Sequence, residues 1–388
     1  MRTNRGCLVL LFLVLALVTP AAAQDPIFDQ GRLHEVRLVM DPSDWAALRQ
    51  NFRSNDYYAA NIAFDGEVVE QAGIRSRGAG SRSSDKPGLK IDFNKYNKSQ
   101  EFHGYKTMVL DNLVQDDSLL RERLAYAVFN EMGHPAPQNA FCRLTVNDAY
   151  WGVYNLVEAV SKPFLKARLG EESGTLYDYE YADDYRFSVR GGDKGAYSPV
   201  PFEPQTNENK FDDALAEFVK AVNDAPEAGL AQAIAAYIDV DRLLSYLATE
   251  NALAESDGFL GYAGMNNFYA YQYGGQKKFV LIPWDKDTSF NAPEWPILYN
   301  VETNVLARKL LADPAKKQIY TDAVKRAVNS YVSTAFLGPK LEQAFSQIRE
   351  AVIADTKKPN SNNDFELSVT GLRGIIAARA ADVAKQAP

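Results

Sequence analysis

The amino-acid sequence predicts an α+β fold, with a β-rich N-terminal part (residues 24–160) and a mostly helical C-terminal part (residues 161–388). Before residue 160, apolar residues alternate with period two in several short segments, which is typical of half-buried strands. From residue 211 onward, apolar residues recur at helical spacing instead. Segregation of strands and helices along the chain is characteristic of α+β proteins.

Residues 1–23 have the pattern of a cleavable signal peptide. Two arginines precede an apolar run, Leu8 to Val18, and small residues follow as far as Ala23. This order of basic, apolar and small residues is that of a secretory leader, and the run is too short to span a bilayer. We expect cleavage after Ala23 and a secreted, periplasmic or cell-surface protein with no membrane span after cleavage. An uncleaved anchor is the alternative.

Two β-hairpins give the strongest signals in the N-terminal part. Segments 58–64 and 68–76 alternate around Asp65-Gly66, a dipeptide that favours a tight two-residue turn. A second hairpin is expected within residues 141–157, with its turn near Asn147-Asp148. The other elements predicted here are a strand at 34–39, a helix that Asp41 caps, a strand at 88–93 and a helix at 118–132.

The C-terminal part contains one long segment, residues 187–208, that is polar, rich in Gly and Pro and without periodicity. We expect a long loop or a lid there. A predicted hairpin, formed by residues 267–273 and 278–282, interrupts the helical pattern. Helices are predicted at 216–222, 230–237, 240–253 and 372–384.

The composition excludes several classes of chemistry. Loss of the leader removes two arginines from the 42 basic residues, so 40 basic residues remain against 50 acidic ones and the mature net charge is −10. This acidity argues against a nucleic-acid partner, which selects for basic surfaces. Cys142 is the one cysteine left after cleavage, and the three histidines lack metal spacing. A disulfide, a zinc site and a histidine-based triad are therefore not expected.

An apolar strand that ends in two carboxylates is the sharpest chemical signal. Residues 279–283 lead into Trp284, Asp285 and, after one lysine, Asp287. Carboxylates at a strand end can converge on a hard cation such as Mg²⁺, which prefers oxygen ligands. The alternative is that both are turn residues that close the strand. Because the flanking aromatic residues suggest burial and buried carboxylates need a partner, we favour a metal site at Asp285 and Asp287.

A second group of polar residues precedes this strand. Asp257-Gly258 ends a predicted helix, and Asn267 opens the next strand. In phosphoryl transfer to a hydroxyl group, one carboxylate accepts the proton of the nucleophile, while an amide and another carboxylate hold the metal. Asp257, Asn267 and Asp285 occur in that order on a loop and two strands, which would bring them together. Taken alone, Asp257-Gly258 is equally well a helix stop.

A loop rich in Gly and Ser follows the first predicted hairpin. It contains Arg77, Gly78 and Ser81, and Lys86 and Lys90 follow it. Such a loop lets backbone N–H groups approach phosphate oxygens, and nearby cations neutralise their charge, so these five residues are candidates for nucleotide binding. The loop is not a Walker sequence, because no Gly-Lys-Ser/Thr opens a helix. A flexible loop with surface lysines is the alternative.

Two glutamates are weaker candidates. Glu122, in the helix predicted at 118–132, could hold in position the lysine of the strand, Lys86 or Lys90. The alternative is that Glu122 forms a solvated i,i+4 pair within its own helix. Glu158 ends the second predicted hairpin, where a linker in contact with the adenine of a nucleotide would run.

Several motifs together carry a family resemblance: Ile74–Gly78, Lys86–Phe93, Tyr150–Glu158, Asp257-Gly258 before Asn267-Phe-Tyr, Ile282–Asp287 and Gly371–Arg379. In this order they resemble the CotH family of spore-coat kinases, from about Phe28 to Ala384. The resemblance implies a diverged protein-kinase-like two-lobe fold that uses ATP and Mg²⁺. It also implies an acceptor Ser or Thr on an extracytoplasmic protein.

The resemblance assigns roles to residues of this sequence. Asp257 would be the catalytic-loop acid, and Asn267 and Asp285 would bind metal, with Asp287 close by. Lys86 would be the nucleotide lysine, although Lys90 aligns almost as well, and Glu122 would be its partner. The His-Arg-Asp and Asp-Phe-Gly tripeptides of ordinary protein kinases are replaced by Ser256-Asp257-Gly258 and Trp284-Asp285-Lys286.

Two other functions fit parts of the sequence. Residues 280–288 partly fit the Asp-x-Asp-x-Thr strand of haloacid-dehalogenase-type phosphatases, in which the first Asp attacks phosphate. That motif normally opens an alternating α/β domain, whereas the residues that follow here have a helical pattern. The other alternative is a non-catalytic, pseudokinase-like module of a cell surface or spore coat. Loss of an acid would favour it, yet Asp257, Asn267, Asp285 and Asp287 are all present.

Overall fold

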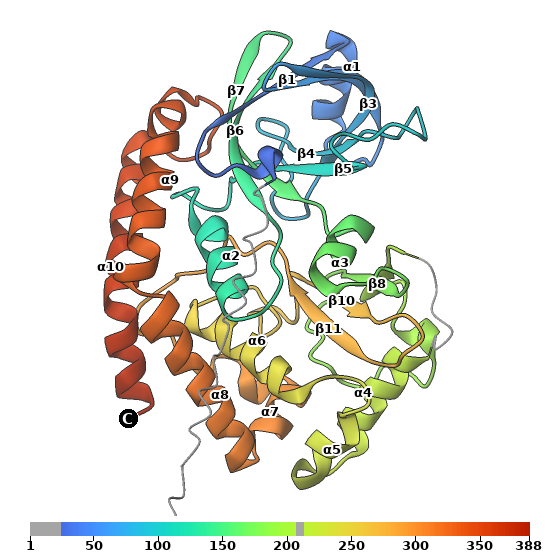
Figure 1. Ribbon diagram of the computed structural model, residues 1–388, viewed down its shortest axis with the longest axis vertical. Coiled ribbons are helices and arrows are strands. Elements are labelled where there is room, and N and C mark those ends of the chain that lie inside the picture. Colours follow the sequence, from blue (N-terminus) through green and yellow to red (C-terminus); the bar gives the residue numbers. More distant parts are fainter. Residues whose placement is uncertain (1–24, 207–212) are drawn as a thin grey trace, which may run out of the picture.

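The computed structural model describes residues 25–206 and 213–388. The predicted signal peptide and the last two residues of the predicted 187–208 loop lie outside this range. Within it, a closed β-barrel is followed by a mostly helical part built around a four-stranded sheet (Figure 1). The predicted α+β class, with strands first and helices later, is confirmed.

The barrel has the strand order β1-β2-β3-β4-β5-β7-β6 and closes where β6 pairs in parallel with β1. Its strands are β1 (His34–Met40), β2 (Tyr58–Phe64), β3 (Glu67–Arg77), β4 (Gly88–Asp92), β5 (Thr107–Asp111), β6 (Asn139–Val146) and β7 (Ala149–Glu158). The two predicted hairpins are confirmed as β2–β3 and β6–β7. Positive φ angles at Asp65, Gly66, Asn147 and Asp148 explain why these dipeptides form the turns. Alternate strand residues fill the barrel interior with apolar side chains.

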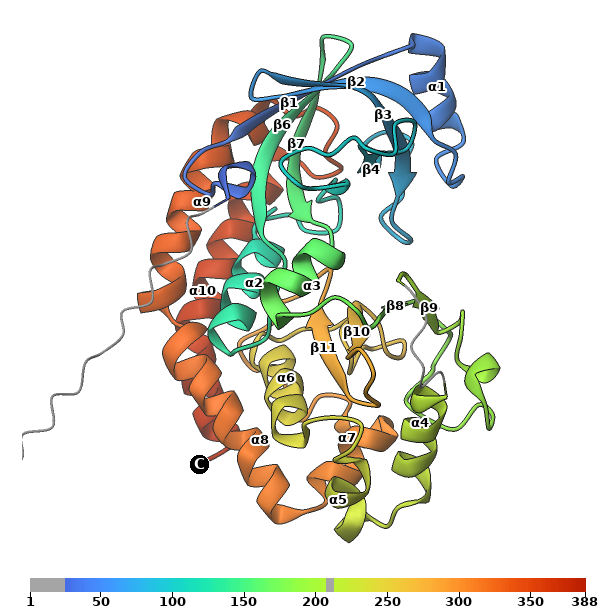
Figure 2. The same cartoon turned by 45° about the vertical axis from the view of Figure 1, so that its right-hand side comes forward.

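The second sheet is antiparallel, with the order β11-β10-β8-β9. Its strands are β8 (Thr175–Tyr179), β9 (Phe202–Pro204), β10 (Phe268–Gln272) and β11 (Phe279–Pro283). The predicted hairpin is confirmed as β10–β11. Residues 187–206 are mostly loop, as predicted for this segment, but they also contain a short 3₁₀ turn and β9, which pairs with β8. Figure 2 shows this sheet on the side of the molecule that also carries α3 and α4.

The helices are α1 (Pro42–Gln50), α2 (Arg121–Glu131), α3 (Lys162–Leu169), α4 (Ala214–Asp224), α5 (Leu230–Ile234), α6 (Val240–Ala252), α7 (Val305–Leu311), α8 (Pro314–Arg326), α9 (Thr334–Ala354) and α10 (Asn362–Gln386). The N-cap of α1 is Asp41, as predicted: its side chain accepts a hydrogen bond from the N–H of Ser43. None of the helices in the described ranges has both the length and the apolar character needed to cross a membrane.

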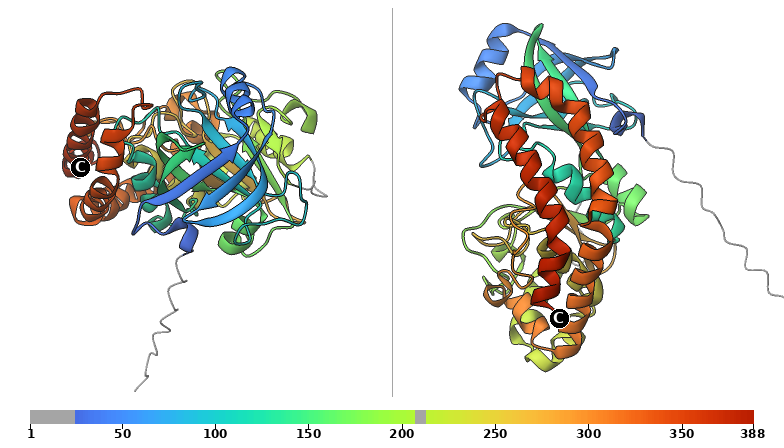
Figure 3. Two further views of the ribbon diagram at one scale, coloured as in Figure 1. Left: turned by 90° about the horizontal axis from the view of Figure 1, so that it is seen from above. Right: turned by 90° about the vertical axis from the view of Figure 1, so that its left-hand side faces the viewer.

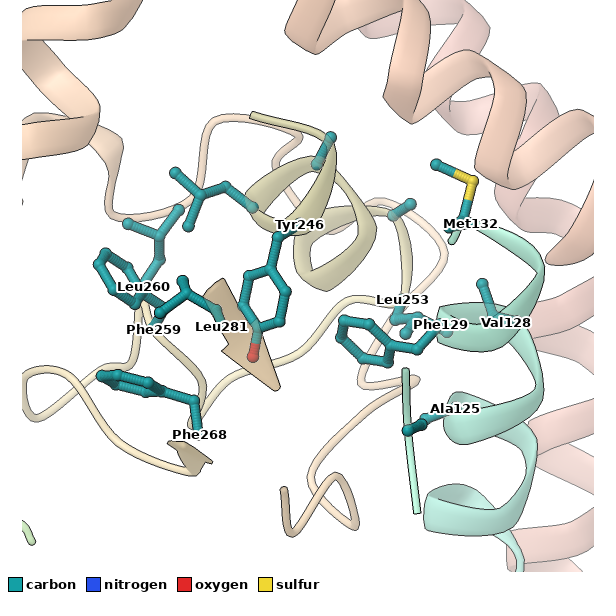
Figure 4. Packing of buried hydrophobic residues seen from close by; sticks show 14 of the residues in the cluster. Ala125, Val128, Phe129, Met132, Tyr246, Leu253, Phe259, Leu260, Phe268 and Leu281 are labelled. Atoms are coloured by element: carbon teal, nitrogen blue, oxygen red, sulfur yellow. The ribbon is translucent and has the colours of Figure 1, made fainter. Parts of the chain in front are cut away.

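Helix α2 lies between the barrel and the helical part, although it is connected to barrel strands at both ends. Its residues Ala125, Val128 and Phe129 belong to the hydrophobic core of the helical part, and Figure 4 shows them beside α6. The rings of Phe129 and Tyr246 on α6 are 5.4 Å apart. Burial of this helix against α6 fixes its position relative to the loop that follows α6.

Helices α9 and α10 form an antiparallel pair that runs along the helical part and reaches the barrel (Figure 3). The connection between them, around Asp355, lies against β7 of the barrel. At its other end, the pair packs against α8 and the C-terminus of α6. We call α9 and α10 the C-terminal hairpin.

Candidate functional site

Asp257 and Asn267 lie side by side between α6 and β10. The Nδ2 atoms of Asn266 and Asn267 are 3.0 and 3.1 Å from Oδ2 of Asp257, and both amides donate hydrogen bonds to this oxygen. Burial raises the pKa of Asp257, and the hydrogen bond from Asn266 opposes the rise. Because Nδ2 of Asn267 donates to Asp257, Oδ1 of Asn267 remains available as a ligand for a metal ion.

Asp285 joins this pair because of the register between β10 and β11. Phe268 lies opposite Pro283, so Asn267 precedes one strand where Trp284 follows the other. The backbone N–H of Trp284 donates to the carbonyl oxygen of Asn267 over 3.3 Å. Asn267 and Asp285 have φ angles of 56° and 50°, a left-handed conformation that is uncommon outside glycine and is frequent at functional sites.

The loops that carry Asp257 and Asp285 are tied together by two buried glutamates. Glu255 accepts hydrogen bonds from the N–H of Asp257 (2.8 Å), from Oγ of Ser289 (2.6 Å) and from the hydroxyl of Thr288. Glu250 accepts from Nζ of Lys286 at 2.9 Å and from the N–H of Phe259. The spacing between the two candidate acids is therefore set by side chains of α6 and of the loop that follows it.

Asp285 and Asp287 have the properties of carboxylates that bind a cation. No hydrogen-bond donor from the described residues contacts either side chain, although Asp287 is only 7% exposed. Burial and the neighbouring Asp111 raise the pKa of Asp285, and burial with Asp285 raises that of Asp287. Among residues 25–206 and 213–388, no three His, Cys, Asp or Glu side chains are close enough to share a metal ion. Carboxylates and amide oxygens are ligand types that suit Mg²⁺, which keeps several waters, so Asp285, Asp287 and Asn267 remain the candidate ligands.

Basic residues of the barrel face these acids. Nη1 of Arg77 is 2.9 Å from Oδ2 of Asp111 at the end of β5. Burial would lower the pKa of Arg77, but Asp111 and Asp285 outweigh it and raise the pKa. Lys90 lies opposite Arg75 in the β3–β4 ladder, on the same face, and has no hydrogen-bond or ion-pair partner in the described part of the chain. Burial and Arg75 lower the pKa of Lys90.

The loop rich in Gly and Ser is held in one conformation by Asn112. Its Nδ2 donates to the carbonyl oxygens of Ser81 (2.9 Å) and Lys86 (2.7 Å). Gly78 has a φ of 105°, and a Cβ there would lie 2.6 Å from Oγ of Ser81, so a larger residue would not fit. Gly80 is exposed, and Ser81 is half-buried.

The predicted pair of Lys86 with Glu122 is wrong. Lys86 is 1% exposed, and its Nζ is 2.8 Å from Oδ2 of Asp355, which belongs to the connection in the C-terminal hairpin. The ammonium group also lies 5.1 Å from the ring centre of Tyr154. Lys86 immediately precedes Pro87 and lies outside β4, whereas Lys90 lies within that strand, so the two lysines do not share a strand face.

Glu122 and Glu158 have other partners. Oε1 of Glu122 accepts from the hydroxyl of Tyr126 at 2.7 Å, and Oε2 accepts from Nδ2 of Asn155 at 2.6 Å. The carboxylate of Glu158 accepts from the N–H of Gln138 (2.9 Å) and from Nη2 of Arg168 (3.2 Å). Thus the Glu158 side chain is already paired, which leaves only its backbone for contact with a nucleotide.

Sequence reasoning missed Asp111, Tyr126, Glu255 and Asp355. Asp111 is the last residue of an apolar strand, and Asp285 comes shortly after another, so the same criterion could have found it. Tyr126 and Glu255 are recognisable only once α2 and the Asp285 loop are placed in space. Asp355 lies 269 residues from Lys86, and no local pattern indicates that contact.

Comparison with known proteins shows to which family the chain belongs. A family model described as CotH kinase protein matches residues 74–383, and the chain therefore belongs to this family. Inner spore coat protein H of Bacillus subtilis (strain 168) is 23% identical over 349 residues, which cover 87% of this chain and 93% of that protein. The resemblance seen in the motifs is thereby confirmed.

Two relatives from Rhizopus delemar are longer than this chain. Spore coat protein homolog 1 is 23% identical over 349 residues, which are 83% of this chain and 54% of the relative. Invasin CotH3 is 24% identical over 324 residues, which are 71% of this chain and 53% of the relative. The matched region thus spans about half the length of each Rhizopus relative.

The substitution Lys86→Met is expected to lower the free energy of unfolding by about 3–5 kcal/mol, because it leaves the buried Asp355 carboxylate without its countercharge. Urea unfolding followed by circular dichroism measures this change. Lys106→Met is the matched control, because the Lys106–Glu101 pair is exposed and contributes about 1 kcal/mol or less. Equal, small losses in both variants would show that the buried pair does not support the fold.

Proposed function

We propose that this chain is an Mg²⁺- and ATP-dependent protein kinase that phosphorylates Ser or Thr of an extracytoplasmic protein. The observation that carries the proposal is the grouping of Asp257, Asn267 and Asp285. A carboxylate, an amide and a second carboxylate, in that chain order, are the parts that phosphoryl transfer to a hydroxyl requires. They belong to two loops held together by Glu255.

A diverged kinase-like arrangement of two lobes is part of the proposal. The barrel would be the nucleotide-binding lobe, and the helical part with β10 and β11 would be the catalytic lobe. Helix α2, attached to the barrel but packed on α6, would link the two. This division is supported by the position of the basic residues on the barrel side and of the acids on the other.

Lys90 is the better candidate for the nucleotide lysine. The Lys86 ammonium group is buried and forms an ion pair with Asp355. The Lys90 ammonium group has no hydrogen-bond or ion-pair partner among the described residues and lies on the same face as Arg75. Arg77, bonded to Asp111, points its charge toward the same region. Together with backbone N–H groups of the loop around Gly78 and Ser81, these cations would bind phosphate oxygens.

The chemical step needs only groups that the site holds, the nucleotide and the acceptor. The acceptor hydroxyl oxygen forms a bond to the γ-phosphorus while the bond from that phosphorus to the bridging oxygen breaks, and ADP leaves with the electron pair. Asp257 orients the hydroxyl group and takes its proton. Asn267, Asp285 and Asp287 would hold Mg²⁺, which when bound neutralises charge on the phosphate oxygens.

The relatives support the proposed location. Their names refer to the spore coat and to invasion, which are surface functions, and the predicted leader agrees with export. We therefore propose an acceptor protein of a cell surface or coat.

The phosphatase alternative does not fit the topology. In the haloacid-dehalogenase pattern, the strand before the first Asp belongs to an alternating α/β domain, but β11 is antiparallel to β10. The non-catalytic alternative retains the same residues and is separated from the proposal by the activity measurement below.

Asp257→Asn is expected to lower kcat for incorporation of labelled phosphate by about 10²–10⁴-fold, because it removes the proton acceptor while keeping the side-chain shape. Asp285→Asn is expected to raise the Mg²⁺ concentration that is required for incorporation of labelled phosphate. Purified mature protein, incubated with γ-labelled ATP and a Ser-rich acceptor, provides the measurement. Asp224→Asn on α4 is the control, since this aspartate is exposed and remote from the site.

Label incorporation that survives both substitutions would contradict the proposal. Binding of Mg²⁺–ATP by the wild type without any incorporation would instead favour the non-catalytic alternative. Each outcome is read against Asp224→Asn, which should match the wild type.

The variant Lys90→Met is expected to weaken ATP binding by about 10- to 150-fold, the loss of a hydrogen bond to a charged group, with no change in the free energy of unfolding. Isothermal titration calorimetry with Mg²⁺–ATP and urea unfolding make the two measurements. A loss of stability without a loss of affinity would assign Lys90 to the fold instead of the nucleotide.

A further inference from the structure

Tyr126 connects the two acidic residues Glu122 and Asp285. It lies one helical turn after Glu122 on α2 and is 1% exposed. Its hydroxyl donates to Oε1 of Glu122 (2.7 Å) and accepts from the backbone N–H of Asp285 (3.1 Å). A phenolic hydroxyl has one hydrogen to donate and lone pairs to accept with, so both bonds can exist together.

The bond to Asp285 acts on a strained part of the backbone. Asp285 has a φ of 50°, directly after β11 ends at Pro283. A left-handed conformation at a residue other than glycine costs about 1–2 kcal/mol and persists only where neighbouring contacts hold it. The hydroxyl of Tyr126 is the one acceptor for this N–H in the described part of the chain.

The other end of this connection is fixed to the barrel. Oε2 of Glu122 accepts from Nδ2 of Asn155 at 2.6 Å, and Asn155 on β7 lies opposite Asp111 on β5. Helix α2 is also held in place by Phe129, which packs against α6 (Figure 4). A hydrogen-bonded path therefore runs from β7 through Glu122 and Tyr126 to Asp285.

We infer that Glu122 and Tyr126 are positioning residues that orient Asp285 toward the metal, acting through the Asp285 backbone. Glu122 does not hold a lysine in this arrangement. It fixes the direction of the Tyr126 hydroxyl, and that hydroxyl fixes the turn from which the Asp285 side chain projects. The assignment of a metal-binding role to Asp285 rests on the proposed function.

Tyr126→Phe tests the inference, because it removes the hydroxyl and keeps the buried ring. Tyr154→Phe is the matched control: its hydroxyl is also buried but has no hydrogen-bond partner among the described residues. Hydrogen–deuterium exchange of residues 279–290 measures protection of the Asp285 N–H without any ligand. Calorimetric titration with Mg²⁺ at saturating ATP measures affinity for the metal.

In Tyr126→Phe we expect faster exchange in residues 279–290 and Mg²⁺ affinity about fivefold weaker, which corresponds to the loss of one neutral hydrogen bond. In Tyr154→Phe both quantities should equal those of the wild type. Unchanged exchange and affinity in Tyr126→Phe would overturn the inference while the proposed function stands. If the wild type binds no Mg²⁺–ATP, the proposed function fails and the metal role of the path fails with it. The exchange measurement then still decides whether Tyr126 fixes the Asp285 backbone.

Discussion

The pairing of β10 with β11 is the constraint on which the candidate site depends. Phe268 opposite Pro283 places Asn267 beside the start of the Asp285 loop. Because β10 also pairs with β8 on its other edge, it cannot shift without breaking two ladders. A slip of one residue would turn every side chain of β11 to the opposite face of the sheet, and Asp285 would leave the neighbourhood of Asn267.

The C-terminal hairpin fixes the barrel and the helical part relative to each other, and these two parts form the two sides of the candidate site. At one end, Asp355 binds Lys86, and the close approach of its carboxylate leaves no space for a Cβ at Gly152. At the other end, the fully buried Arg379 donates to the carbonyl oxygens of Asn251 (2.6 Å) and Ala252 (3.0 Å). These carbonyls end α6, where a cation is favourable and where the chain enters the Asp257 loop. The barrel and the helical part are therefore both anchored to the same pair of helices, the barrel through Lys86 and the helical part through α6.

Local signals in the sequence predicted what local physics determines. The turns at Asp65-Gly66 and Asn147-Asp148 follow from backbone preference, and the strands beside them follow from alternation. Asp257, Asn267 and Asp285 could be grouped because short strands and tight connections bring such residues together. Lys86 was misplaced for the opposite reason, since its partner Asp355 is distant in the chain and belongs to a helical connection. Closure of the barrel by the parallel pairing of β1 with β6 could not be predicted for the same reason, because the two strands are distant in the chain.

The charges of the candidate site support the proposal that it binds a cation together with a polyphosphate. Burial raises the pKa values of Asp257, Asp285 and Asp287. Neighbouring carboxylates raise them further: Glu255 acts on Asp257, Asp111 on Asp285, and Asp285 on Asp287. The nearby Lys286 is paired with Glu250, and its charge lowers the pKa values of Asp257 and Asp285 without outweighing the rise. A divalent ion would offset these carboxylates. On the barrel side, Arg77 is paired with Asp111, whereas Lys90 has no hydrogen-bond or ion-pair partner among the described residues and could bind an anion. Under the proposed function, a triphosphate would supply that negative charge, and the acids would hold its metal ion. These charges are therefore an argument for the metal–nucleotide complex of the proposed function.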